Sequence, residues 1–352
     1  MEIQKLLEIT VNKKASDLHL ISEAPPILRI NGVLVPVTGE DVLTKKAVEE
    51  LVFSLVNPEQ KEIILVNKEI DFSFSYQNQG RFRVNAYYQK GTLAAALRLL
   101  PAKIPSIDEL NLPKICHQFV KLRQGFILVT GPTGHGKSTT LAAIIDEINQ
   151  TRPVHIVTIE DPIEYVFSHQ KAIVSQREIR GDTHSWQIAL RSCLREDPDV
   201  VMVGEMRDYE TIAAALTIAE TGHLVLATLH TNSASQTIDR VVDVFPERQQ
   251  AQVRMQLANT LEAILSQRLL PCLNGGRTPA TEILLGNSAV KTSIREGKSH
   301  LIDNIIQTSA ELGMETLEMN LAKLIRQGKI SLEVAKAFAF RPEGLMRLMK
   351  SR

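Results

Sequence analysis

The sequence Gly131-Pro132-Thr133-Gly134-His135-Gly136-Lys137-Ser138-Thr139-Thr140 completes the pattern G-x-x-x-x-G-K-[ST] of a phosphate-binding loop. An apolar run of strand length, residues 126–130, comes directly before it, and residues 138–149 have the composition of a helix. The glycines let the backbone fold around an anion with its N–H groups inward, and the helix N-terminus adds partial positive charge. We therefore expect residues 131–139 to bind a nucleoside triphosphate.

Two side chains of this loop have expected roles. Lys137 would contact the β- and γ-phosphates, and the Ser138 hydroxyl would bind Mg²⁺. The alternative is a chance loop of glycine and lysine. The strand and helix predicted on either side of the loop argue against that alternative, because the phosphate-binding fold requires both.

The composition bounds the kind of protein. The chain has 352 residues, enough for two domains, with 44% hydrophobic and 23% charged residues. Lys and Arg total 40, and so do Asp and Glu, so no overall positive field would attract nucleic acid. Cys116, Cys193 and Cys272 lie far apart, which favours a reducing compartment and neither a zinc site nor a disulfide framework. We find no signal peptide and no membrane-spanning run, and expect a cytoplasmic protein.

The chain order predicts two α/β domains. Residues 1–100 form the smaller one, residues 101–113, with three prolines, form a linker, and residues 114–352 form the larger one. In the first domain we expect helices at 3–11 and 45–56, a strand at 16–20, a hairpin around Asn31-Gly32, and an antiparallel meander of 70–76, 81–88 and 92–99.

The larger domain should alternate strands and helices up to about residue 246. From there the pattern predicts a mainly helical subregion, interrupted by a β-pair of Leu269-Leu270 with residues 280–285. The expected helices are 246–268, 288–296, 301–310, 314–327, 331–339 and 342–350.

Three arginines of the meander share one expected face. Because side chains alternate along a strand, Arg81 and Arg83 point away from the core, and Arg98 does so on the next strand. The simpler interpretation is a solvated sheet face. The phosphate-binding loop favours a second interpretation, in which these cations serve a bound phosphate.

Reactive side chains follow four predicted strands of the larger domain. The phosphate-binding loop follows the first strand, and Glu160, Glu205 and His230 follow the others. In a parallel α/β sheet, ligands bind beyond the carboxyl ends of the strands. We therefore expect these groups to converge on the nucleotide.

Glu205 follows the buried run 200–203, and its expected role is to orient or deprotonate the attacking water. The alternative is an ion pair with Arg207. Gly204 occupies the position at which a Walker B aspartate usually binds metal. The binding of Mg²⁺ should therefore depend mainly on Ser138, the phosphates and water.

Glu160, Asp161 and Glu164 form an acidic cluster around Pro162. The cluster would position water and Mg²⁺. Alternatively, Asp161 caps a helix and Glu164 is solvated. His230 lies on the phosphate side of its strand and is expected near the γ-phosphate.

With these motifs assembled, the chain resembles the secretion-type hexameric ATPases, and among them the type IV pilus retraction ATPases of the PilT and PilU type. The resemblance covers nearly the whole length. It rests on residues 15–20 (ASDLHL), 80–85 (GRFRVN), 131–140, 158–165 (TIEDPIEY), 196–208 and 219–232.

This resemblance implies an α/β fold with a PAS-like N-terminal domain and a RecA-like P-loop ATPase domain. It implies a homo-hexamer that hydrolyses ATP with Mg²⁺ between subunits. Hydrolysis would drive pilus retraction through an inner-membrane platform protein, with a paralogous pilus ATPase as a further partner and no contact with nucleic acid or, except through partners, with the membrane. Glu205 is implied as the catalytic carboxylate, assisted by Glu160, His230 and the arginines Arg81 and Arg98.

The short chain, the single N-terminal domain and the lack of a four-cysteine zinc site favour the retraction class over assembly or type II secretion ATPases. Three departures from the pattern leave the PilU-like accessory ATPase as an alternative. Residues 289–296 match the AIRNLIRE motif of the retraction family only in part. The tail 342–350 looks more like PilU, and His135 replaces the usual small residue of the loop. From other classes, a non-catalytic nucleotide-binding regulator and a DNA motor also remain.

Overall fold

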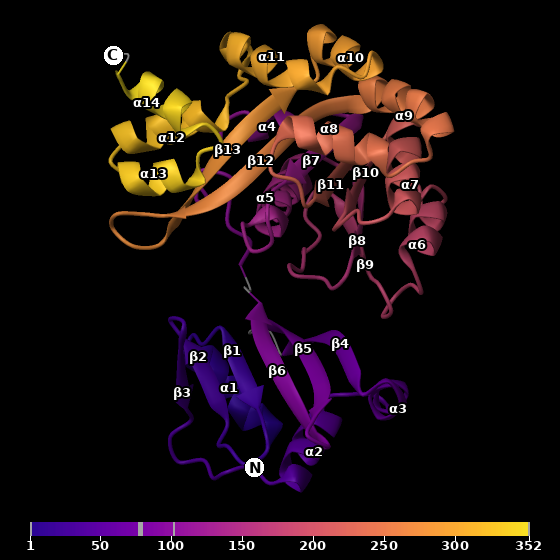
Figure 1. Ribbon diagram of the computed structural model, residues 1–352. Coiled ribbons are helices and arrows are strands. Elements are labelled where there is room, and N and C mark those ends of the chain that lie inside the picture. Colours follow the sequence, from indigo (N-terminus) through magenta and orange to yellow (C-terminus); the bar gives the residue numbers. More distant parts are fainter. Residues whose placement is uncertain (1, 77–79, 101–102, 351–352) are drawn as a thin grey trace. The chain divides into compact units, whose positions relative to one another are not determined.

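The computed structural model describes residues 2–76, 80–100 and 103–350. The chain divides into two compact units (Figure 1). The first comprises residues 1–103 together with the short segment 162–166, and the second comprises residues 104–161 and 167–352. Residues 103–113 form turns and irregular backbone, whereas Pro101 and Ala102, at the start of the expected linker, lie outside the described residues.

The first unit contains one antiparallel sheet in the order β3-β2-β1-β6-β5-β4. Asn31 and Gly32 have φ values of 50° and 84° at the turn between β2 and β3, the left-handed pair that a tight hairpin requires. The predicted meander is confirmed as β4, β5 and β6, although residues 77–79 of its first turn lie outside the described residues. The elements are α1 (Ile3–Asn12), β1 (Asp17–Leu20), β2 (Ile27–Ile30), β3 (Val33–Pro36), α2 (Lys45–Phe53), α3 (Pro58–Asn67), β4 (Glu69–Tyr76), β5 (Gly80–Gln89) and β6 (Thr92–Leu100).

The arginine face of this sheet exists. Arg83 on β5 stands directly opposite Arg98 on β6, and Arg81 lies two residues from Arg83 on the same face. Arg98 Nε lies 2.9 Å from an Asp17 carboxylate oxygen, and Arg83 Nε lies 3.2 Å from Asp71. Arg81 donates to the Ser73 hydroxyl. In this structure the sheet's own polar groups therefore engage the arginines.

The second unit is built on a sheet in the order β13-β12-β7-β11-β10-β8-β9. Strands β12, β7, β11, β10, β8 and β9 run parallel, and β13 is antiparallel to β12 at one edge. Its elements as far as β11 are α4 (Cys116–Phe119), β7 (Gly125–Thr130), α5 (Lys137–Thr151), β8 (His155–Glu160), β9 (Ile173–Glu178), α6 (Trp186–Cys193), β10 (Val200–Val203), α7 (Tyr209–Glu220) and β11 (Leu224–Leu229).

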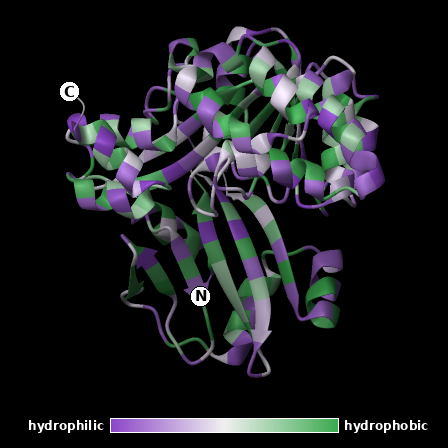
Figure 2. Cartoon of the chain, turned by 45° about the horizontal axis from the view of Figure 1, so that its top comes forward, coloured by the Kyte–Doolittle hydropathy of each residue, from purple (hydrophilic) through white to green (hydrophobic). Residues whose placement is uncertain are grey.

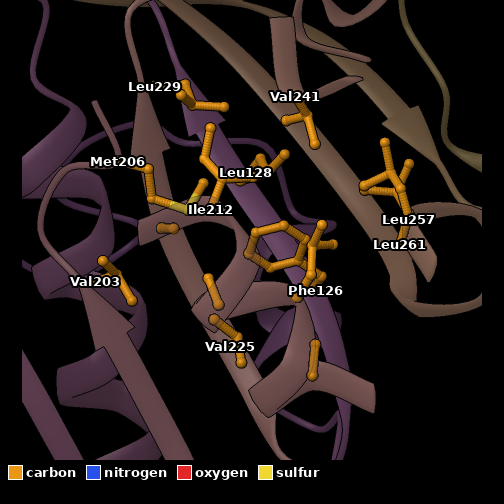
Figure 3. Close-up of a cluster of buried hydrophobic side chains, with 14 of the residues drawn as sticks. Phe126, Leu128, Val203, Met206, Ile212, Val225, Leu229, Val241, Leu257 and Leu261 are labelled. Carbon is orange, nitrogen blue, oxygen red and sulfur yellow. The ribbon is translucent and has the colours of Figure 1, made fainter. Parts of the chain in front are cut away.

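Helices cover both faces of this sheet. Alternate residues of the parallel strands, such as Phe126 and Leu128 of β7, share one hydrophobic cluster with residues of α6 to α11, whereas α5 packs against β7 and β11. Figure 3 shows Phe126, Val203 and Val225 in this cluster. Strands buried on both faces are continuous apolar runs, and in Figure 2 hydrophilic residues lie mainly on the covering helices.

The chain beyond α9 departs from the predicted helical subregion. The expected helix 246–268 ends at Thr260, and β12 begins at Leu261 between β7 and β13. Residues 263–267 of β12 are all buried, and such a run cannot be told from a buried helix by periodicity. The predicted β-pair joins the right two strands but in the wrong register. Leu269 and Leu270 pair with Pro279 and Thr278, and residues 280–285 pair with 263–268. The remaining elements are α8 (Ala234–Asp243), α9 (Glu247–Thr260), β12 (Leu261–Pro271), β13 (Arg277–Leu285), α10 (Ser288–Arg295), α11 (Ile302–Thr308), α12 (Leu317–Arg326), α13 (Leu332–Phe338) and α14 (Pro342–Lys350).

Four helices and strands were not predicted: helices α3, α4 and α8 and strand β9. The last three helices, α12 to α14, form a cluster of their own around Leu321 and Leu345, against Leu270 of β12. No helix within the described residues is long and apolar enough to span a membrane.

Replacing Phe126, which is fully buried in the main cluster, should destabilise the second unit. We expect Phe126→Ala to lower the free energy of unfolding by about 3–5 kcal/mol, because lost transfer energy and a cavity add. Urea unfolding followed by circular dichroism measures this. Ile188→Ala on α6, where the side chain is 52% exposed, is the control and should change the value by less than about 0.5 kcal/mol. A cost below about 1 kcal/mol for Phe126→Ala would contradict the assignment.

Candidate nucleotide-binding site

The carboxyl ends of four parallel strands meet at one edge of the second sheet. Thr130 at the end of β7 pairs with Leu229 at the end of β11, and Val203 of β10 pairs with Ile159 of β8. The phosphate-binding loop, Glu160, Glu205 and His230 follow these strand ends directly. The structure therefore brings together the groups of the second unit that the sequence predicted at this edge.

The backbone of the loop is arranged for an anion. Gly131, Gly134 and Gly136 have φ values of 142°, 78° and 82°, which a side chain would strain. A Cβ at Gly134 would meet no atom within 4 Å, so the middle of the loop is open. A turn that includes left-handed glycines, here Gly134 and Gly136, can direct N–H groups into a concave site.

Helix α5 begins without a side-chain cap. Eight other helices among the described residues begin at a Ser, Thr, Asn or Asp whose side chain accepts from a first-turn N–H: α2, α3, α6, α7, α8, α10, α12 and α13. The N-cap of α5 is Gly136, which supplies no such acceptor. The N–H groups at the start of this helix therefore fit a ligand oxygen, as the phosphate of a nucleotide would provide.

Lys137 and Ser138 differ in their surroundings. The Lys137 side chain is buried, and its ammonium donates to the carbonyl oxygens of Gly131 and Pro132 at 2.9 and 3.0 Å. Ser138 is exposed at the start of α5. Among the described residues no group of three or more His, Cys, Asp or Glu side chains could form a metal site. The donors fit a Mg²⁺ bound mainly through phosphate and water, with the Ser138 hydroxyl as protein ligand.

Glu205 is paired rather than solvated. Arg207 binds it with both ends of the guanidinium, Nε to Oε1 and NH2 to Oε2, each at 2.9 Å. His230 Nε2 lies 2.9 Å from the same Oε1. The ion pair with Arg207, considered as the alternative role of Glu205, is thus present together with the predicted position near the loop. Burial acts to raise the pKa of Glu205, but the hydrogen bond from Arg207 and the charges of His230, Arg207 and Lys137 outweigh it, and the pKa lies below its ordinary 4.5.

His230 connects this carboxylate to the loop. Its Nδ1 lies 3.3 Å from the Thr133 hydroxyl and 3.5 Å from the Lys137 ammonium. In the neutral ring that carries its proton on Nε2, Nδ1 accepts from the ammonium, which only donates, and Nε2 donates to Glu205. The loop and the β10 strand end are thereby joined through one imidazole.

Glu160 is buried at the end of β8 and accepts from Thr158 at 2.7 Å and from Gln176 at 3.2 Å. No helix follows Asp161 within the described residues, because the backbone continues as a bend and irregular structure. The helix-capping alternative for Asp161 is therefore wrong. Glu164 belongs to the segment 162–166 that groups with the first unit.

The glycine before Glu205 has a packing reason. A Cβ at Gly204 would lie 3.2 Å from the Ile159 carbonyl oxygen and 3.4 Å from Glu160 Cα. The third neighbour, at 3.6 Å, is the indole of Trp186, which packs against the main cluster. The space that an aspartate would need is therefore already filled.

Two predicted site residues lie in the first unit, Arg81 on β5 and Arg98 on β6. Their proposed role at the nucleotide stays a prediction. The contacts of β12 and β13 with the loop, made by Gln267, Leu269 and Arg277, were missed. The available signal for Gln267 was the polar segment Ser266-Gln267-Arg268 between apolar residues.

The chain is similar to proteins of one family over almost its full length. A family model described as type II/IV secretion system protein matches residues 2–336. A Pseudomonas aeruginosa protein named type IV pilus retraction ATPase PilT is 46% identical over 343 residues, 97% of this chain and 99% of the relative. The type IV pilus ATPase PilU of the same organism is 40% identical over 351 residues, 99% of this chain and 92% of the relative. A crystal structure of the pilus retraction motor PilT with bound ADP has a TM-score of 0.93 and 47% identity, and the match covers 99% of both chains. These matches confirm the expected fold class and the resemblance.

The pairing of Glu205 predicts a pH-dependent contribution to stability. A carboxyl whose pKa is lowered in the folded state stabilises it above the unfolded pKa, and this contribution is lost as the pH falls through the folded pKa. The unfolding midpoints of the wild type and Glu205→Gln should therefore differ most near pH 7 and converge below about pH 4.5, as measured by thermal denaturation. In an Arg207→Met background this difference at pH 7 should be smaller. The hydrogen bond from Arg207, which does most to lower the pKa of Glu205 against the effect of burial, is then absent. A pH-independent difference would contradict this account.

Proposed function

This chain belongs to the type II/IV secretion system protein family, and we propose that within it the chain is the ATP-hydrolysing motor of type IV pilus retraction. The observation that carries the proposal is the convergence of the uncapped α5, Glu205 and His230 at one sheet edge. The similarity to a retraction ATPase at 46% identity supplies the substrate class. The similar crystal structure of PilT contains bound ADP, and this supports the proposal that the loop of this chain binds a nucleotide.

Binding would use the loop backbone and Lys137. Its ammonium now contacts two carbonyl oxygens of the loop, and a phosphate oxygen is a stronger acceptor because it carries charge. Mg²⁺, held through Ser138, would supply charge neutralisation at the phosphates. The remaining loop residues, 131–136 and Thr139, would surround the phosphate chain, with N–H donors from all of them except Pro132.

Hydrolysis would use Glu205 as the group that orients water and accepts its proton. Its pKa lies below the ordinary 4.5, so it is ionised at neutral pH, and only the carboxylate can accept a proton from the water. Oε1 accepts from both Arg207 and His230, so the water would bind at Oε2, which accepts only from Arg207, or would replace one of these partners. Glu160, fixed by Thr158, would assist at the neighbouring strand end, and His230 would contact the γ-phosphate.

The first unit would supply cations. Arg81 and Arg98 share one face of its sheet, and a supplied arginine is worth about 10³–10⁵ in rate in other phosphoryl-transfer enzymes. We place the active form in a homo-hexamer in the cytoplasm. There it would act at the inner membrane through a platform protein, alongside a paralogous pilus ATPase and without nucleic acid.

A second candidate is an accessory, PilU-like retraction ATPase. It is favoured by the 40% identity to PilU over 99% of this chain and by the PilU-like tail, which forms α14. Both candidates share the site chemistry. Genetics separates them.

Glu205→Gln should keep nucleotide binding and lower the rate of ATP hydrolysis by about 10²-fold or more, because an amide cannot accept the proton. Phosphate release measures the rate, and calorimetry measures the affinity. Glu262→Gln, at the far end of β12, removes a carboxylate in an ion pair with Lys291 and is the control. If the wild type does not hydrolyse ATP and Glu205→Gln makes no further difference, the result would favour a non-catalytic nucleotide-binding regulator.

Deleting the gene in its host should leave cells that carry pili but do not move by twitching, because a retraction motor disassembles filaments that another ATPase builds. Electron microscopy and a surface-motility assay measure both properties. Complementation with Lys137→Ala should fail. Loss of the pili themselves would indicate an assembly ATPase, and retained twitching would favour the accessory role.

A further inference from the structure

Strand β12 extends beyond the strand that it pairs with. The ladder between β7 and β12 ends at Thr130 opposite Ser266, whereas β12 continues to Pro271 with β13 on its other side. Beyond Ser266, the side of β12 that faced β7 would lack a partner. The phosphate-binding loop lies against that side.

The contact begins with the backbone. A Cβ at Gly131 would lie 2.2 Å from the carbonyl oxygen of Gln267, so this glycine allows the loop to approach β12. Further along, the backbone N–H of Leu269 donates to His135 Nδ1 at 2.9 Å. An imidazole thus takes the place that a strand carbonyl would have had.

Gln267 binds the loop with both ends of its amide. Its Nε2 donates to the His135 carbonyl oxygen at 2.8 Å, and its Oε1 accepts from the Thr140 hydroxyl at 2.7 Å. The side chain is 2% exposed. Because the two contacts lie on either side of Lys137, they fix the backbone where the loop becomes a helix.

We propose that His135 and Gln267 are positioning residues for the nucleotide phosphates, which hold the loop on β12 with its N–H groups directed at the ligand. This proposal rests on the proposed function. It concerns residues that touch the loop rather than the reacting atoms. It gives a role to His135, where the resemblance led us to expect a small residue.

The contact of His135 depends on its protonation. Nδ1 accepts only in the neutral ring with the proton on Nε2. In a protonated ring, Nδ1 carries a hydrogen that would face the N–H of Leu269, and the hydrogen bond would be lost. Burial and the charges of Arg268 on β12, Lys137 on α5 and Arg277 on β13 lower the pKa of His135 from its ordinary 6.5. Acidification below pH 6.5 should therefore weaken the hold of β12 on the loop as the ring becomes protonated.

The first experiment compares ADP binding to the full-length wild type, His135→Ala and His135→Asn by calorimetry from pH 8 to pH 5.5. Asparagine offers an acceptor near the position of Nδ1 but does not titrate. At pH 8 we expect His135→Ala to raise Kd about three- to tenfold, for one lost hydrogen bond, and His135→Asn to stay within about twofold. On acidification the wild type should lose affinity relative to His135→Asn. The readout is the ratio of the Kd of the wild type to the Kd of His135→Asn at each pH. The ratio removes the effect of the terminal phosphate of ADP, which titrates over the same range.

The second experiment uses Gln267→Glu, which keeps the shape but places a carboxylate oxygen against the His135 carbonyl. We expect Kd for ADP to rise at least tenfold. The buried carboxylate should also lower the unfolding midpoint, so Kd is measured at a temperature at which the variant is folded. The matched control on the same strand, Glu262→Gln, should leave Kd unchanged. A merely structural role would move stability and leave the pH dependence of binding alone.

The outcomes separate this inference from the proposed function. If the wild type binds ADP and Lys137→Ala does not, the nucleotide site stands. If His135→Ala and Gln267→Glu then bind ADP as the wild type does at every pH, the inference is wrong and the function remains. If the wild type binds no ADP, both the inference and the proposed function are wrong.

Discussion

The N-terminus of α5 is the constraint on which the site depends. A helix of 15 residues begins after a glycine, which has no side chain to accept from the first N–H groups. These groups and the helix dipole attract an anion only if the preceding loop stays open. The buried strand β7 fixes one end of the loop at the sheet edge, and β12 contacts it along its length. Much of the second sheet can therefore be understood as support for one turn of backbone.

The charges of the site satisfy one another in this structure. Lys137 contacts loop carbonyls, Glu205 is bound by Arg207, and His230 lies between them. Arg98 of the first unit is paired with Asp17. A nucleotide would therefore exchange partners with these groups rather than meet unpaired charges. Such exchange makes the net free energy of each contact smaller than its geometry suggests, because the earlier partner must be given up.

The sequence predicted the features that depend on local pattern. The loop at 131–139, the strand ends before Glu160, Glu205 and His230, and the meander of the first unit follow from motif, apolar runs and alternation. It did not predict the start of β12, because a strand buried on both faces and a buried helix have the same composition. Gln267 was missed because the residues that it contacts are more than 100 residues away in the chain, and no local pattern indicates such contacts. The pairing of Glu205 with Arg207 was foreseen only as an alternative, since two residues of spacing do not fix side-chain direction.

The packing around Gly204 has a consequence for observing the molecule. Trp186 is the single tryptophan of the chain, and its indole lies beside the glycine that precedes Glu205. Light emission from an indole depends on the polarity and the charges around it. The protein therefore carries an intrinsic optical reporter at the tip of β10, and rearrangement of that strand end can be followed in real time without attaching a dye.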